Sequence, residues 1–259
     1  MKSGTTRTLK EWPITIGAQT RSFANKVLHA LTPYECILCA KNSTTHTNLC
    51  PTCSQDLPLI KQPCRHCGVE TAQSVSPLLC GACILKKPVF HQCVAVMSYA
   101  SPADKLISEF KFNANFAAGL ALGEMLAQEF KRHCECHGYP DAIVPIPLHQ
   151  TRLQERGFNQ ALELAKQLTF LTGTPVLNKV LTRIKNTRPQ TEIKRAGLRK
   201  SNLKKAFACI DLHNEAGIKH VALVDDVVTT GATLSEAARA LFIGGAEKVD
   251  CFCVARATR

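Results

Sequence analysis

Two adjacent carboxylates followed by small hydroxyl side chains distinguish the segment VALVDDVVTTGATL, residues 221–234. Asp225 and Asp226 are suited to accept hydrogen bonds from vicinal hydroxyls, or to hold a hydrated Mg²⁺. The backbone N–H groups of residues 229–233, the threonine hydroxyls and the positive end of a following helix are suited to bind a phosphate. A diol beside a phosphate describes a ribose 5-phosphate, whereas an Asp-Asp pair alone is also found in solvated loops and generic metal sites.

The residues around this segment predict the elements that position it. Residues 221–224 are four consecutive apolar side chains, as in a buried strand, and the sequence from Gly231 onward has the pattern of a helix. The aspartates and threonines are therefore expected in the turn at the carboxyl end of the strand. Ligands of open parallel sheets bind at that edge.

Strand-like and helix-like segments alternate from residue 141 to the end of the chain. They are DAIVPIP, GFNQALELAKQL, KVLTRI, AFACI, VALVDD, GATLSEAARALF and KVDCFCVA. Upstream, residues 93–99 have the pattern of a strand and residues 116–130 that of a helix. This alternation predicts an α/β fold, with a parallel sheet covered by helices on both faces.

Eight of the fourteen cysteines form four C-x-x-C pairs. They are Cys36, Cys39, Cys50, Cys53, Cys64, Cys67, Cys80 and Cys83. Two such pairs complete a tetrahedral site of four thiolates, so the eight residues predict two Zn²⁺ ions. Both sites are expected to be structural, because four thiolates leave no position for water and a short segment with few large apolar side chains needs metal to fold.

The cysteines also admit other interpretations. A redox role needs one reactive C-x-x-C at a helix start, whereas four spread pairs flanked by Pro, Gly and Thr are typical of zinc ribbons. Sequential pairing is preferred, and crossed pairing stays open.

The segment HCECH, residues 133–137, is expected in one loop, too short to wrap four ligands around an ion. Four more cysteines fall in predicted strands and are expected to fill the core: Cys93, Cys209, Cys251 and Cys253.

Positive charge is concentrated in one part of the chain. The formal net charge is +12, and residues 179–205 hold ten Lys and Arg against the single Glu192. Such a segment is typical of contact with a polyanion or a phosphorylated ligand, the alternative being a solvated basic helix and loop. The sequence has no secretory signal and no apolar run of about 18 residues, so a cytoplasmic location without a membrane span is expected.

The segment 221–234 resembles the phosphoribosyl pyrophosphate (PRPP) signature of type I phosphoribosyltransferases. The four C-x-x-C pairs, SYASPADKLISEFKF, VPIPLHQTRLQERGFNQ and TRPQTEIKRAGLRKSNLKKAF resemble the ComF family of competence-associated proteins, including its GntX-like members. This resemblance covers nearly everything after residue 30. It implies an N-terminal extension with a short helix (1–33), a double zinc ribbon (34–88) and a type I phosphoribosyltransferase-like domain (89–259).

The resemblance also implies roles for individual residues. Asp225 and Asp226 hold the ribose hydroxyls. The 5-phosphate is wrapped by Thr229, Thr230, Gly231, Ala232 and Thr233. The pyrophosphate loop is Pro145, Ile146, Pro147, Leu148 and His149, with Arg152 and Arg156 as charge candidates, although RGFNQ (156–160) is equally suited to start a packed helix.

A mobile catalytic loop is implied for the basic residues 183–195. Lys and Arg side chains there would close over pyrophosphate and stabilise it as it leaves, and Lys185 and Arg188 are the candidates. The chain ends about five residues after its last predicted strand, so any hood over the acceptor is expected from the zinc module and residues 93–115.

Two functions follow from the resemblance. In the first, the protein binds PRPP with Mg²⁺ and transfers phosphoribose to an unidentified base, releasing pyrophosphate, in connection with DNA uptake and natural transformation. In the second, it is a non-catalytic sensor of PRPP or nucleotides and a DNA-binding adaptor. The partners implied are PRPP, an acceptor base, and single-stranded DNA or DNA-uptake proteins.

Overall fold

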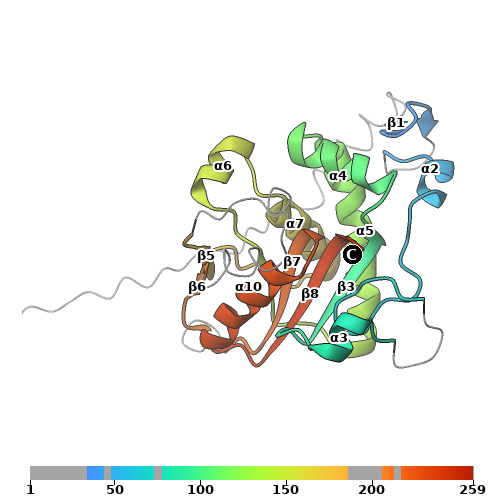
Figure 1. Ribbon diagram of the computed structural model, residues 1–259. Helices are drawn as coiled ribbons and strands as arrows, with labels where there is room; N and C mark the ends of the chain where they lie inside the picture. The colour runs from blue at the N-terminus through green and yellow to red at the C-terminus, as the bar shows by residue number, and fades with distance from the viewer. Residues whose placement is uncertain (1–33, 44–47, 73–77, 186–205, 213–216, 259) are drawn as a thin grey trace, which may run out of the picture.

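A four-stranded parallel sheet forms the centre of the computed structural model (Figure 1). The structure describes residues 34–43, 48–72, 78–185, 206–212 and 217–258. In spatial order the strands are β3 (Gln92–Ser98), β8 (Lys248–Arg256), β7 (His220–Val228) and β4 (Ala142–Pro145). All neighbouring pairs are parallel, so the four carboxyl ends meet at one edge.

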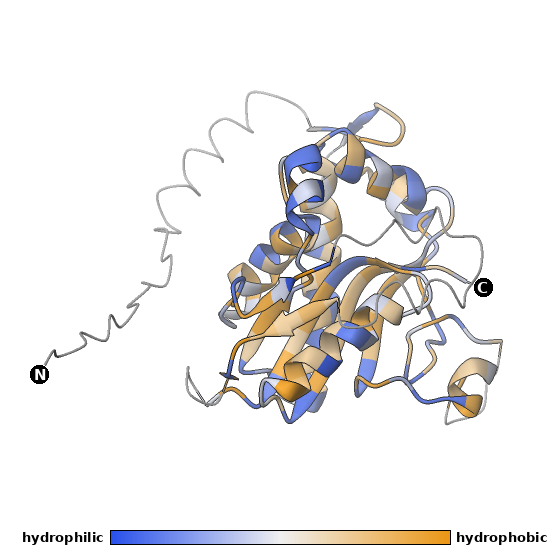
Figure 2. Cartoon of the chain, turned by 60° about the vertical axis from the view of Figure 1, so that its left-hand side comes forward, coloured by the Kyte–Doolittle hydropathy of each residue, from blue (hydrophilic) through white to orange (hydrophobic). Residues whose placement is uncertain are grey.

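Helices cover both faces of this sheet, as the sequence predicts. Helices α5 (Phe116–His137) and α7 (Gln160–Thr172) pack on one face, and α10 (Ala232–Ile243) packs on the other (Figure 1). Helix α4 (Ala103–Phe112) packs on α5, and α6 (Gln150–Arg156) follows β4. Apolar residues are concentrated in the strands and helix faces between these layers (Figure 2). Among the described residues, no helix has both the length and the apolar character to cross a membrane.

Strand β8 shows how alternation builds the two core layers. Cys251 and Cys253 belong to the cluster that contains Leu234 of α10, whereas Phe252 belongs to the cluster of α5. The Phe252 ring meets the Phe130 ring edge-on, with centroids 4.7 Å apart. Side chains of this size each stabilise the fold by about 1.5–3 kcal/mol when fully buried.

Three of the four strand cysteines lie in this core, as expected. Cys93, Cys251 and Cys253 are buried, whereas Cys209 is only partly buried. Cys209 belongs to β6 (Phe207–Cys209), which pairs antiparallel with β5 (Leu181–Arg183) in a separate two-stranded sheet. The segments KVLTRI and AFACI therefore do not extend the parallel sheet.

The two halves of the cysteine module lie at separate places along β3 (Figure 1). The first half contains β1 (Tyr34–Glu35), β2 (Asn42–Ser43) and α2 (Pro51–Gln55), and the second contains α3 (Gly81–Leu85). The connecting chain runs antiparallel to β3, with Ile60 N donating to Val96 O at 3.1 Å. The ribbons are thus hydrogen-bonded to the sheet, and the expected boundary between residues 88 and 89 stays a prediction.

Candidate functional site

The eight paired cysteines form two clusters of four sulfur atoms. Within each cluster the Sγ atoms all lie within 4.8 Å of one another. The Cys39–Cys50 and Cys67–Cys80 sulfur pairs are 3.7 and 3.6 Å apart. Zn–S bonds of about 2.3 Å in a tetrahedron place sulfurs about 3.8 Å apart, so both clusters fit a structural Zn²⁺. Sequential pairing is confirmed: Cys36, Cys39, Cys50 and Cys53, then Cys64, Cys67, Cys80 and Cys83.

Backbone N–H groups around the clusters favour the thiolates that Zn²⁺ needs. Cys80 N donates to Cys64 Sγ at 3.3 Å. Burial works to raise the pKa of the Cys36 and Cys64 thiols, but backbone hydrogen bonds outweigh it and lower these pKa values to about 6 and about 7. One thiol in each cluster is thus biased towards the thiolate form that Zn²⁺ binds.

Asp225 and Asp226 lie at the carboxyl edge of the sheet, but within β7 and not in the turn after it. The strand continues to Val228 because Val227 and Val228 pair with Ala255 and Arg256 of β8. The expectation that the aspartates lie in the turn is therefore wrong, because the strand ends at Val228, four residues later than expected. Their position at the ligand-binding edge of the sheet is as predicted.

Residues 229–233, which follow β7, form the turn that we call the phosphate turn. Gly231 caps α10 with a φ of +74°, a conformation that side chains with a Cβ rarely adopt, and α10 begins at Ala232. Ala232 N donates to Thr230 Oγ1 at 3.3 Å. A helix start that follows a glycine turn provides the N–H groups and the dipole that favour an anion.

The predicted pyrophosphate loop lies beside these residues. Pro145 ends β4 in register with Val224 of β7, and Ile146 N donates to Val224 O at 2.8 Å. Asn159 Nδ2 holds the loop from the other side by donating to Ile146 O at 3.1 Å. The sheet thus brings together the loop and the aspartates, which are separated by about 80 residues of sequence.

His149 is the N-cap of helix α6, and the two arginine candidates lie in that helix. His149 Nδ1 accepts a hydrogen bond from Thr151 N at 3.3 Å, which caps α6. The Arg156 guanidinium lies 5.4 Å from the centre of the Phe112 ring in α4. The helix predicted at RGFNQ is α7, capped by Asn159, so Arg156 ends one helix just before the next begins.

Two cations that the sequence does not single out, Lys111 and Arg183, interact with the aspartates: Lys111 forms an ion pair, and Arg183 acts through its charge. Lys111 Nζ of α4 lies 2.9 Å from Asp226 Oδ1, and both side chains are largely buried. Burial and the charge of Asp226 raise the pKa of Asp225 to about 7, although Lys111 and Arg183 pull it down. Burial, assisted by Arg152, lowers the pKa of Arg183 to about 10, and Asp225 opposes that change.

The structure describes one of the two catalytic-loop candidates. Lys185 follows β5 within the described residues, and Arg188 lies outside them. Arg183, the last residue of β5, is a member of the basic stretch that lies within the described residues, and its charge acts on Asp225. Its interaction with an aspartate 42 positions away has no signal in a single sequence.

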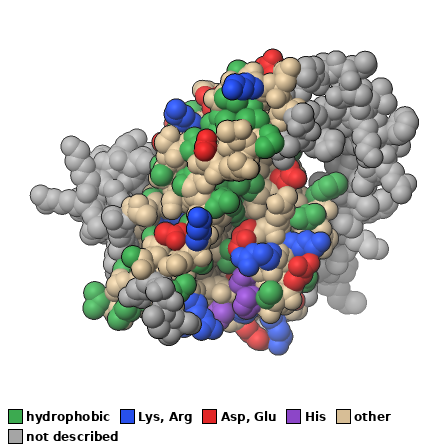
Figure 3. Space-filling view, turned by 90° about the vertical axis from the view of Figure 1, so that its right-hand side faces the viewer, with side chains coloured by type: hydrophobic (Ala, Val, Ile, Leu, Met, Phe, Trp, Pro, Cys, Tyr) green, Lys and Arg blue, Asp and Glu red, His purple; other side chains and the backbone are tan. Residues whose placement is uncertain are grey.

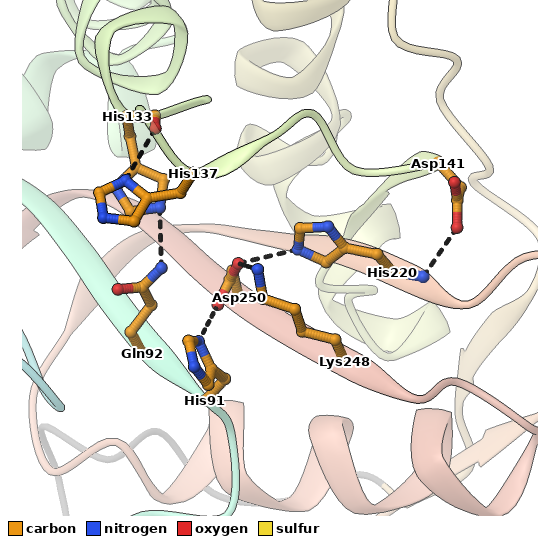
Figure 4. Close-up of polar contacts among 8 residues, drawn as sticks. All are labelled: His91, Gln92, His133, His137, Asp141, His220, Lys248 and Asp250. Carbon is orange, nitrogen blue, oxygen red and sulfur yellow. Dashed lines mark hydrogen bonds and ion pairs between the residues drawn. The ribbon is translucent and has the colours of Figure 1, made fainter. Parts of the chain in front are cut away.

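A polar network lies at the opposite, amino edge of the sheet (Figure 4). Asp250 of β8 accepts hydrogen bonds from His91 Nδ1 at 2.9 Å and His220 Nε2 at 2.8 Å, and Lys248 Nζ lies 3.1 Å away. Burial works to raise the pKa of Asp250, but these three partners outweigh it and hold that pKa well below its usual range. The network joins the amino ends of β7 and β8 to the residue that precedes β3, at the opposite edge from the phosphate turn.

The segment HCECH is the last part of α5 and not the expected loop, because the buried face of this helix continues from Phe130 to Cys134. His133 stacks on His137 with ring centroids 4.3 Å apart, and its Nε2 lies 2.8 Å from Gln92 Nε2 (Figure 4). Burial lowers the pKa of His133 to about 4, so the ring is neutral and accepts from the amide.

On the face that carries the zinc ribbons, histidines lie among charged side chains (Figure 3).

Comparison with known families agrees with this architecture. The double zinc ribbon domain family matches residues 27–84, and the phosphoribosyl transferase domain family matches residues 117–259. The fold and the site thus define a zinc-ribbon protein with a phosphoribosyltransferase-like domain.

Three relatives match most of the chain. Competence protein F of Haemophilus influenzae is 35% identical over 227 residues, which are 86% of this chain and 97% of the relative. DNA utilization protein YhgH of Escherichia coli is 36% identical over 82% of this chain and 91% of its own length. Competence protein ComFC of Bacillus subtilis is 30% identical over 86% and 83% of the two chains. The chain belongs to the ComF family of competence-associated proteins.

Proposed function

We propose that this protein binds PRPP with Mg²⁺ and transfers its phosphoribosyl group to a base, releasing pyrophosphate. The observation that carries the proposal is the position of Asp225 and Asp226 beside the phosphate turn, at the edge of a parallel sheet where ligands bind. Carboxylates that accept from the ribose hydroxyls and a helix start that receives the 5-phosphate match the two ends of a ribose 5-phosphate.

The residues of the site fit the chemistry of such a transfer. The anomeric carbon acquires oxocarbenium character as pyrophosphate leaves, so the protein must stabilise a departing anion. Lys111, Arg183 and Arg152 supply positive charge on the described side of the site. Lys185 and Arg188 are proposed to add to it when the basic segment closes.

Mg²⁺ suits the donors that the site and the ligand together provide. The ion prefers oxygen ligands and is held by one or two carboxylates, waters and substrate phosphates. When bound, it neutralises charge on the pyrophosphate. Asp225 and Asp226 are the carboxylates that would contact it, directly or through water.

A titration of PRPP and Mg²⁺ into the protein by calorimetry tests binding. Wild type is compared with Asp225→Asn/Asp226→Asn, and the control is Glu124→Gln/Glu135→Gln, which removes two exposed carboxylates of α5. Binding in wild type and control, lost in the aspartate variant, supports the proposed site. Pyrophosphate release is then measured with a panel of bases, and release that depends on one base identifies the acceptor.

A second candidate function is a non-catalytic PRPP or nucleotide sensor that works with single-stranded DNA. The names of the relatives favour it, because they refer to competence and DNA utilization. In either function we propose a cytoplasmic role connected with DNA uptake. PRPP binding without pyrophosphate release from any base would support the sensor, and no PRPP binding would contradict both functions.

A further inference from the structure

Arg256, the last residue of β8, has a buried guanidinium and is only 4% exposed. Its Nε donates to the carbonyl oxygen of Cys67 at 2.9 Å. Its Nη1 donates to Val228 O at 2.9 Å, to Ala257 O at 3.0 Å and to Thr229 O. One side chain therefore joins the second cysteine cluster to the first residue of the phosphate turn.

A buried cation needs negative partners, because an unpaired charge in the interior is strongly destabilising. No carboxylate within the described residues forms an ion pair with Arg256. Its partners are carbonyl oxygens, and one of them belongs to Cys67 of the second cluster. Four thiolates around one Zn²⁺ keep a net negative charge, so the metal-bound cluster balances Arg256 at short range.

The carbonyl oxygen of Cys67 is held in place by the turn that binds the metal. Gly68, the next residue, has a φ of +68°, and its N donates to Cys64 O at 2.9 Å. A Cβ on Gly68 would lie 2.7 Å from the carbonyl oxygen of Cys93 in β3. The turn therefore packs directly on the sheet, and its conformation determines the position of the Cys67 carbonyl oxygen that accepts from Arg256.

The hydrogen bonds of Arg256 also orient the phosphate turn. In a trans peptide the C=O and the following N–H point in opposite directions. Because Arg256 holds the carbonyl oxygens of Val228 and Thr229, the N–H groups of Thr229 and Thr230 are directed away from the guanidinium. These N–H groups belong to the turn that receives the 5-phosphate in the proposed function.

We propose that Arg256 is a positioning residue that couples zinc in the second cluster to the geometry of the phosphate turn. Zinc at Cys64, Cys67, Cys80 and Cys83 fixes the Cys67 carbonyl oxygen, Arg256 aligns between that oxygen and the turn, and the turn keeps its N–H groups in place. Loss of this zinc loosens the turn without unfolding the sheet. The effect on PRPP rests on the proposed function, whereas the effect on the turn itself does not.

Matched cysteine variants separate the two zinc clusters. Cys83→Ser in the second cluster is compared with Cys53→Ser, its equivalent in the first, by hydrogen–deuterium exchange of the phosphate turn and the start of α10. We expect exchange there to be about tenfold faster in Cys83→Ser than in Cys53→Ser. Protection of β4 and of the first half of β7 reports that the sheet stays folded. Equal exchange in the two variants would contradict the coupling.

Arg256→Lys tests the side chain itself with both clusters intact. It keeps the charge but loses the planar fork, so it cannot hold the same set of carbonyl oxygens. The variant should retain two zinc ions by elemental analysis, exchange faster in the phosphate turn, and bind PRPP with Mg²⁺ about tenfold more weakly. The control is Arg132→Lys, an exposed arginine of α5.

The two proposals fail in distinguishable ways. An Arg256→Lys variant with wild-type exchange in the phosphate turn would overturn the role of Arg256. If wild type itself does not bind PRPP, the proposed function fails, and the exchange data still decide the coupling. Adding Arg256→Lys to Cys83→Ser should change exchange little further, because both remove the same connection, and additive effects would contradict a shared path.

Discussion

Lys111 Nζ lies 2.9 Å from Asp226 Oδ1, and this ion pair connects helix α4 to the Asp-Asp pair of β7. The side chains of Lys111 and Asp226 are 18% and 13% exposed, so solvent screens the pair less than it would at the surface. Asp225 and Asp226 are adjacent carboxylates that repel each other, and Lys111 relieves this repulsion. The chain segment that follows β3 therefore belongs to the candidate site, and its role as a hood over an acceptor stays a prediction.

We expect Lys111→Met to weaken PRPP binding by about tenfold or more, because a hydrogen bond between charged groups contributes about 1.5–3 kcal/mol. Without the lysine, ionising both aspartates becomes harder and the site offers fewer acceptors to the ribose. Lys105→Met is the matched control, since Lys105 is an exposed lysine of the same helix. Calorimetry on both variants measures the effect, and equal Kd values for the two would show that Lys111 has no such role.

Asp225→Asn should stabilise the unliganded protein at pH 8. Burial and Asp226 raise the pKa of Asp225 to about 7, so the folded protein holds a proton there that the unfolded chain releases near pH 4. Asp225 therefore costs increasing stability as pH rises from about 4 to about 7, and the amide removes this cost. Urea unfolding at pH 4 and pH 8 measures it: the gain should appear at pH 8 and vanish at pH 4. A destabilised variant at pH 8 would contradict the direction of the shift.

The sequence predicts the parts of the site that are local and misses those that depend on long-range contact. The glycine turn that precedes α10 and the cysteine clusters are each specified within a few residues, so local spacing is enough to predict them. Lys111 and Arg256 act on groups that are distant in sequence, and a single sequence contains no signal for either contact. The boundary of β7 was missed because Val227 and Val228 pair with β8, which local pattern does not report.

The helix at residues 133–137 illustrates a different limit. Two histidines, two cysteines and a glutamate in five residues are typical of a reactive loop, whereas the spacing of Phe130 and Cys134 is helical. The structure shows that Phe130 and Cys134 continue the buried face of α5, so packing determines the backbone there. Conversely, KVLTRI and AFACI were recognised as strands, but their antiparallel partnership depends on how the chain between them returns, which spacing does not reveal.

Removal of zinc should unfold the cysteine module before it affects the sheet. Metal binding contributes much of the folding free energy of small zinc modules, whereas the sheet has its own apolar core. After treatment with a chelator, protease sites within residues 36–83 should become cleavable while β4 and β7 stay intact. Mass spectrometry of limited digests locates the cuts. Full protease resistance of residues 36–83 after verified loss of zinc would contradict this expectation.

Asp250→Asn should destabilise the protein at neutral pH, by about 3 kcal/mol, because it removes the buried charge that accepts hydrogen bonds from His91 and His220 and pairs with Lys248. The pKa of Asp250 is held below its usual range, so its contribution is fully present above about pH 4 and is lost as pH falls further. Urea unfolding at pH 7 and pH 3 should therefore show a large difference from wild type at pH 7 and a smaller one at pH 3. Asp104→Asn, a partly exposed carboxylate in the first turn of α4, is the control and should change little at either pH. A loss of stability that is the same at both pH values would mean that the asparagine acts through packing, and the charge of Asp250 would then have no part in holding the three strands together.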